Sequence, residues 1–103
     1  MHNLVELEIP DQRQAVEVAA LFSTLADPTR VRIIAALLSG EINVGALAGL
    51  VGVSESAVSH QLRHLRHTRL VQANKRGREV YYCLDDDHVA ELFQRGLEHV
   101  SHD

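Results

Sequence analysis

The amino-acid sequence predicts one mainly α domain that carries a single small β-hairpin. The chain has 103 residues, which leaves room for one domain over residues 1–103. Five segments show helical spacing of apolar residues or follow an Asp, Asn or Ser that can cap a helix. A sixth segment instead has strand-forming residues on both sides of a glycine.

The first four helices are expected to begin at capping residues. Asp11 begins the first helix, and Asp27 begins the second with Pro28 at its first position, where a missing N–H costs nothing. Asn43 begins a short third helix that Gly52 ends, and Ser54 begins a fourth that runs to about residue 67. The third and fourth helices are therefore joined by a glycine-containing turn, as in a helix-turn-helix.

The C-terminal part of the chain adds a hairpin and a last helix. Residues 71–74 and 79–84 form the expected strands, and Gly77 provides the turn between them. One of the three aspartates at 85–87 caps a helix that runs to about residue 101. The order of elements predicts a winged helix-turn-helix, with DNA-reading helices at about 44–67 and a two-stranded wing at about 71–84.

Basic residues are concentrated in one segment of an otherwise acidic chain. The net charge of the whole chain is −4, which alone would argue against nucleic acid. Residues 54–78, however, hold six basic residues and one acidic residue, a net charge of +5. A compact basic segment is the electrostatic pattern of a nucleic-acid contact, so double-stranded DNA is the expected partner.

The fourth expected helix has one apolar and one polar face. Val58, Leu62 and Leu65 have the spacing of a core face, and the opposite face carries only hydrogen-bonding side chains. Such side chains can read base edges, and cations at the hairpin tip can contact phosphates. The alternative is an ordinary helical hairpin with a solvated polar face. The predicted DNA-binding residues are Ser54, Ser56, Ser59, His60, Arg63, His64, Lys75, Arg76 and Arg78.

Four candidate metal ligands flank the last helix. Asp86 and His88 lie at its start, and His99 and His102 lie at its end. Carboxylate oxygen and imidazole nitrogen suit Zn(II) and Co(II). Residues 88 and 99 are about 16 Å apart along a helix axis, so one ion cannot join both in one chain. An antiparallel partner helix would complete two identical four-ligand sites per homodimer. The alternative is that these are scattered surface histidines, with Asp86 only a helix cap.

Three stretches of the chain strongly resemble the ArsR/SmtB family of bacterial metal-responsive repressors. They are residues 25–30 (Leu-Ala-Asp-Pro-Thr-Arg), 54–66 around Val58-Ser59-His60-Gln61-Leu62, and 77–82 (Gly-Arg-Glu-Val-Tyr-Tyr). The resemblance covers roughly residues 15–102. It implies a winged-helix homodimer, formed through the first and last helices, that leaves its operator when an inducer binds.

The resemblance also implies which residues sense the inducer. One branch of the family places its site on the last helix, and zinc sensors of that branch match Asp86, His88, His99 and His102 residue by residue. In those sensors the ligand equivalent to His99 is tied to a carbonyl that maps near Arg69, which implies an allosteric link between these two residues. Other members carry paired cysteines on the third helix, whereas residues 41–47 contain none. Sensing through paired thiols is therefore not expected.

Several alternatives to a zinc-sensing repressor remain. Ni(II) or Co(II) could be the inducer, because these ions favour more than four ligands and His2 with the Met1 amine could add donors. A metal-independent DNA-binding regulator is a second alternative. An enzyme with a catalytic zinc is not expected, since no general base accompanies the ligands and the basic wing would be unexplained.

Two features of the sequence indicate the cellular compartment in which the protein is expected. The lone Cys83 excludes an intrachain disulfide and is interpreted as a small buried hydrophobe. The longest apolar run has six residues, so no membrane partner is expected, and a reducing cytoplasm is the expected location.

Overall fold

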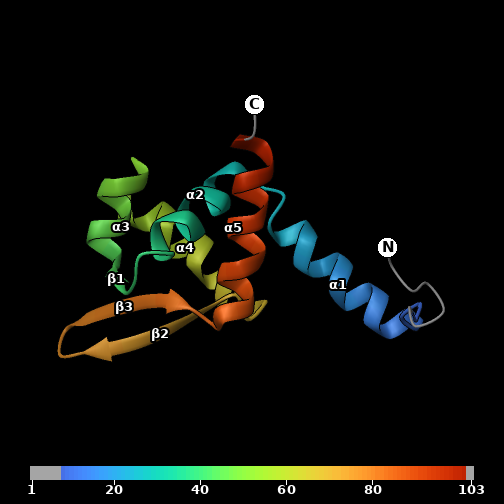
Figure 1. Ribbon diagram of the computed structural model, residues 1–103. Coiled ribbons are helices and arrows are strands. Elements are labelled where there is room, and N and C mark those ends of the chain that lie inside the picture. The colour runs from blue at the N-terminus through green and yellow to red at the C-terminus, as the bar shows by residue number, and fades with distance from the viewer. Residues whose placement is uncertain (1–7, 102–103) are drawn as a thin grey trace.

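The computed structural model describes residues 8–101, and the candidate ligands His2 and His102 lie outside that range. Five helices and three strands make up the described chain (Figure 1). In order they are α1 (Gln12–Thr24), α2 (Pro28–Leu37), β1 (Ile42–Asn43), α3 (Val44–Val51), α4 (Glu55–His67), β2 (Val71–Arg76), β3 (Glu79–Leu84) and α5 (Asp87–Ser101).

Each helix begins where the sequence predicts, at a side chain that accepts a hydrogen bond from the first turn. Asp11 accepts from the Gln14 amide at 2.8 Å, and Asp27 accepts from the Arg30 amide at 3.0 Å. The side chains of Asn43, Ser54 and Asp86 cap α3, α4 and α5 in the same way, at 2.8, 3.1 and 3.0 Å. These bonds satisfy amide groups that no earlier turn of the helix can reach.

The wing has three strands in the described chain, not the two that the sequence predicts. β2 and β3 form the expected antiparallel hairpin, and Gly77 adopts a φ of 63° in its turn. β1 is the additional strand and pairs with the other edge of β3, with Ile42 opposite Tyr82 and Asn43 opposite Tyr81. The segment just before α3 is thereby attached to the wing.

The core lies between α2, α3, α4 and the base of the wing. Its fully buried side chains are aliphatic, and they include the predicted core face of α4. The largest are Ile33, Ile34, Leu37, Leu47, Val58, Leu62, Leu65 and Leu70. This packing fixes the rotation of α4 about its axis, and so decides which of its residues face solvent.

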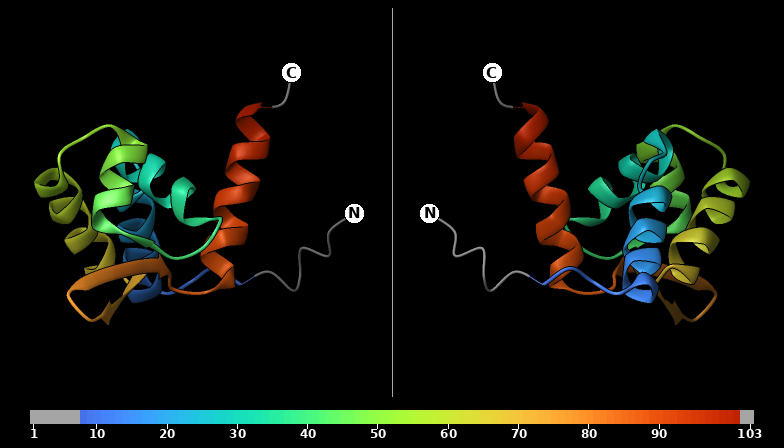
Figure 2. Two further views of the ribbon diagram at one scale, coloured as in Figure 1. Left: turned by 90° about the vertical axis from the view of Figure 1, so that its left-hand side faces the viewer. Right: turned by 90° about the vertical axis from the view of Figure 1, so that its right-hand side faces the viewer.

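Helices α1 and α5 lie to one side of this core. Figure 1 shows α1 extending away from the rest of the molecule, and Figure 2 shows α5 rising from the end of β3, away from the wing tip. Both helices expose large apolar side chains: Val16 and Phe22 on α1 are 56% and 51% exposed, and Val100 on α5 is 76% exposed. Among the described helices, none is long and apolar enough to cross a bilayer.

Candidate nucleic-acid interface and metal site

The polar face of α4 is exposed in the orientation that the sequence predicts. Ser56, His60, Arg63 and His64 are exposed, while Ser59 is half-buried. Ser54 is exposed as well, but its hydroxyl oxygen already accepts from the Ala57 amide, so its role is at least partly to start the helix. The structure thus gathers most of the predicted base-reading residues on one accessible helix face.

The turn before α4 sets the angle between the two helices of the pair. Gly52 ends α3 with a φ of 80°, and its N–H donates to the Ala48 carbonyl at 2.8 Å. A side chain at this left-handed position would strain the backbone, which explains the glycine. Val53 also donates to the Ala48 carbonyl, at 3.3 Å, and Ser54 then caps α4 directly.

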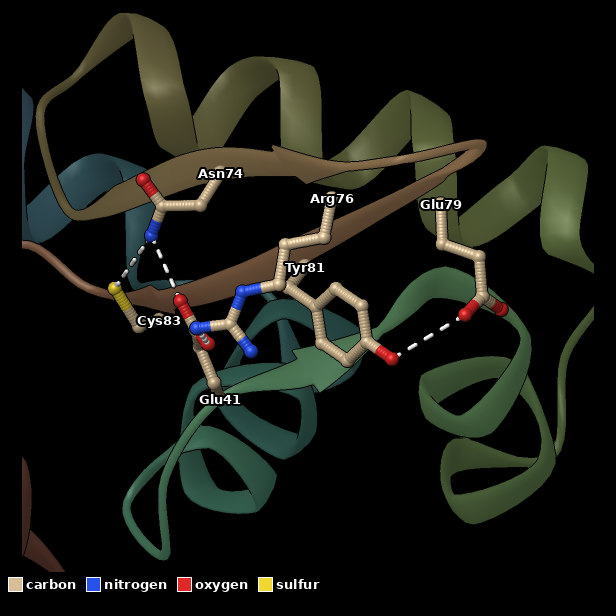
Figure 3. A network of polar contacts seen from close by, with 6 residues as sticks. All are labelled: Glu41, Asn74, Arg76, Glu79, Tyr81 and Cys83. Carbon is tan, nitrogen blue, oxygen red and sulfur yellow. Dashed lines mark hydrogen bonds and ion pairs between the residues drawn. The ribbon is translucent and has the colours of Figure 1, made fainter.

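The three predicted wing cations have different surroundings. Lys75 and Arg78 are exposed and form no ion pair within the part of the chain that the structure describes. Arg76 instead forms an ion pair with Glu41, and its guanidinium lies 5.0 Å from the centre of the Tyr81 ring (Figure 3). A carboxylate therefore already compensates the charge of Arg76.

Glu41 joins the loop before β1 to the wing. Its other carboxylate oxygen accepts from the Asn74 side-chain amide at 2.8 Å, and Figure 3 shows both contacts converging on this one residue. The same Asn74 amide lies 3.9 Å from the sulfur of Cys83. Cys83 is half-buried, whereas the sequence predicted a buried side chain. This network could not be predicted from the sequence, because Glu41 and Arg76 are far apart along the chain.

A second long-range contact joins α2 to α4. The Arg30 side chain donates from Nε to the Gln61 side-chain oxygen at 2.7 Å, and from Nη1 to the Thr24 carbonyl at 3.2 Å. Arg30 therefore connects the end of α1 with the middle of α4. Arg30 and Gln61 both lie in stretches that carry the family resemblance, but their pairing depends on the complete fold.

Two of the four predicted metal ligands lie close together. His88 Nδ1 is 3.7 Å from Asp86 Oδ2, and the His88 side chain is 91% exposed. The other carboxylate oxygen of Asp86 caps α5, which orients the side chain. His99 is exposed near the opposite end of α5. No group of three or more candidate ligands converges within residues 8–101, so the described part of one protomer provides at most a half-site.

Arg69 lies beside the Asp86–His88 pair. These three residues line one surface depression, together with Thr68 and Leu70 from the segment after α4. Arg69 adopts a φ of 62°, the left-handed conformation that a non-glycine residue rarely takes. The two predicted ligands at the start of α5 are therefore adjacent to the end of α4.

Two helices joined by a glycine turn, an exposed polar second helix and a basic hairpin define a winged helix-turn-helix protein. The model of the bacterial regulatory protein arsR family matches residues 27–73. A transcriptional repressor SmtB homolog from Synechocystis sp. is 48% identical over 96 residues, which are 93% of this chain and 73% of that protein. The chain belongs to the ArsR family. It is a DNA-binding transcription regulator and not an enzyme.

Solved structures confirm the predicted fold class. The crystal structure of the AntR antimony-specific transcriptional repressor is 34% identical and superimposes with a TM-score of 0.85, covering 95% of this chain and 89% of that one. A homodimeric winged helix-turn-helix DNA-binding domain from Mycobacterium bovis, solved in solution, is 31% identical with a TM-score of 0.79; the match covers 92% of this chain and 94% of that one.

Proposed function

We propose that this chain is a homodimeric, metal-sensing repressor that binds an inverted-repeat operator as the apo dimer and releases it when Zn(II) binds. The observation that carries the proposal is the placement of potential ligands on α5. Asp86 and His88 lie together at its start, and the exposed His99 lies near its end. Neither end of α5 alone provides the four ligands of a closed zinc site, which favours a site shared between two chains.

An exposed apolar groove supports pairing through α1 and α5. The groove has a volume of about 290 Å³ and is lined by Phe22 from α1 and by Leu92, Phe93, Leu97 and Val100 from α5. Phe22 and Val100 are large apolar side chains that are more than half exposed, and covering them with a partner would remove apolar surface from water. A second copy of the chain is the expected occupant, as in the homodimeric relative from Mycobacterium bovis.

Antiparallel packing of two α5 helices would unite the half-sites. The start of each α5 would then lie beside the end of the other, so Asp86 and His88 would meet His99 and His102 of the partner subunit. Three imidazoles and one carboxylate form a closed four-ligand shell that suits Zn(II), with Co(II) and Ni(II) as alternative inducers. The antimony-specific relative supports metal sensing as a function of this fold, without indicating which ion this chain binds.

The position of Arg69 supports the route from metal to DNA. A metal-bound imidazole commonly donates its free N–H to a backbone carbonyl, which fixes both tautomer and ring direction. Arg69 shares a depression with Asp86 and His88 at the start of α5. In the antiparallel dimer, His99 of the partner subunit is the ligand that would reach Arg69. This bond would displace α4. The coupling free energy between metal binding and DNA binding would be roughly 1–3 kcal/mol.

The experiment mixes two variant chains. The first carries Asp86→Ala and His88→Ala, and the second carries His99→Ala and His102→Ala. The heterodimer would hold one intact site and one empty site, so we expect one tightly bound Zn(II) per heterodimer, two per unmodified dimer and none in either variant homodimer. Isothermal titration calorimetry measures the stoichiometry. A heterodimer that binds no Zn(II) tightly would contradict the shared site.

Operator release is measured on the same proteins. The operator is a duplex selected from a random-sequence pool with the apo protein, and its affinity is measured with and without stoichiometric Zn(II) at fixed salt. We expect Zn(II) to weaken binding by the unmodified dimer much more strongly than binding by either variant homodimer. Equal operator affinity with and without bound Zn(II) in the unmodified dimer would contradict the proposed function.

A further inference from the structure

We propose that His60 and His64 form a second transition-metal site on the exposed face of α4, contained within one chain. This site is separate from the ligands on α5, and an ion bound there would cover the surface that reads DNA. The two imidazole rings contact each other edge to face, with their centres 5.2 Å apart and their planes at 83°. Both side chains are exposed, so an ion can reach them from solvent.

The separation of the two rings fits chelation of one ion. A metal–nitrogen bond of about 2.1 Å puts an imidazole centre about 3.2 Å from the ion, and a tetrahedral angle then separates two such centres by about 5 Å. The observed distance of 5.2 Å matches that value. The spacing of four residues on a regular helix sets this geometry, and it is the spacing at which two histidines of one helix bind zinc in metalloproteases.

The surroundings limit how tightly this pair can bind. No third candidate ligand joins it within the described residues, so water must complete the coordination shell. Arg63 lines the same depression, and its positive charge disfavours a cation. Binding should therefore be weaker than at a four-ligand site. It should favour divalent ions that prefer imidazole nitrogen, in the order Cu(II) above Ni(II) and Zn(II).

A metal ion at this site would oppose DNA binding directly. The imidazole nitrogens that ligate the ion would no longer be available to base edges, and the ion with its water would occupy space in the groove. Metal and DNA would then compete for one surface, and no movement of α5 would be required. The effect would be the same in either subunit and independent of ligands from the partner.

The test uses a full-length chain with His2, His88, His99 and His102 all replaced by Gln, so that only His60, His64 and His67 remain of seven histidines. Zn(II) is the probe, titrated by calorimetry with circular dichroism to verify folding. We expect one Zn(II) per chain. His60→Gln and His64→Gln should each raise the dissociation constant by about tenfold or more, because each leaves a single imidazole of the pair.

His67→Gln is the matched control, because His67 lines the same depression and has the same chemistry. It should change the dissociation constant by less than about twofold. An equal loss from all three substitutions would indicate independent surface imidazoles and would overturn the site, as would Zn(II) binding that survives His60→Gln and His64→Gln. Neither outcome bears on the α5 site, whose three histidine donors this chain lacks.

A second measurement tests competition with DNA. In the same four-glutamine chain, saturating Zn(II) should weaken operator binding, and operator should weaken Zn(II) binding by the same factor. Adding His64→Gln should abolish this mutual effect, whatever that substitution does to the metal-free affinity. Zn(II) that binds the His60–His64 pair without changing the affinity for operator would overturn the proposed role.

Discussion

Replacing the wing arginines one at a time should separate a free cation from a compensated one. Arg78 forms no ion pair in the described chain, whereas Arg76 pairs with Glu41 and stacks on Tyr81. Each protein cation that neutralises a DNA phosphate steepens the dependence of log affinity on log salt by about 0.9. Arg78→Ala should therefore flatten that slope by about 0.9, while Arg76→Ala should flatten it by less than about half as much.

The magnitude follows from the salt range of the assay. Raising the salt concentration from about 50 to 200 mM changes the affinity contributed by one phosphate contact by about 3.5-fold. Fluorescence anisotropy with a labelled duplex resolves that factor at each salt concentration. Glu41→Gln provides the reciprocal variant, because it removes the carboxylate and frees Arg76. We expect it to steepen the slope and tighten binding at low salt.

Circular dichroism serves as the control that a changed salt dependence does not come from loss of structure. Arg76 is 62% exposed, so its ion pair should contribute at most about 1 kcal/mol to stability, and all three variants should remain folded by circular dichroism. If Arg76→Ala flattened the slope as much as Arg78→Ala, and Glu41→Gln left it unchanged, then Glu41 would not compensate Arg76 and the reasoning would be wrong.

Three further predictions concern the core, the dimer and the metal. Leu62→Ala should lower the free energy of unfolding by about 2–5 kcal/mol in urea titrations, because Leu62 is fully buried; a loss below about 1 kcal/mol would contradict this packing. Val100→Asp should shift the chain toward monomer in analytical ultracentrifugation, since it puts a charge on the apolar groove, and an unchanged dimer would place the interface elsewhere. Zn(II) affinity should fall steeply between about pH 7.5 and 5.5, because protons compete for the imidazole nitrogens; a flat profile would exclude histidine ligands.

Local chemistry made the helices predictable from the sequence. Each helix start depends on one short side chain and the amide three residues later, as at Asn43 and Ser54, so the signal lies within one turn of the chain. The rotation of α4 was predictable for a similar reason. Val58, Leu62 and Leu65 are spaced for one face of a helix, and all three are fully buried.

Contacts between distant segments were not predictable in this way. β1 has only two residues, too few for an alternating pattern, and it is a strand only because β3 offers a free edge. The pairing of Arg30 with Gln61 and the contact of Glu41 with Arg76 likewise depend on the complete fold. The chemistry of the α5 ligands could be recognised from their types and spacing, but their assembly depends on a second chain and on His102, which lies outside the described residues.

The short strand β1 has a mechanical consequence for the molecule. Asn43 is opposite Tyr81 in the sheet, caps α3 through one side-chain atom at 2.8 Å, and donates to Glu79 through another at 3.4 Å. These contacts join the hairpin to the start of α3, so we expect the wing and α3 to move together. A biosensor built on this chain should carry its two dyes across α5 and the wing, because a pair on α3 and the wing would move together and report little.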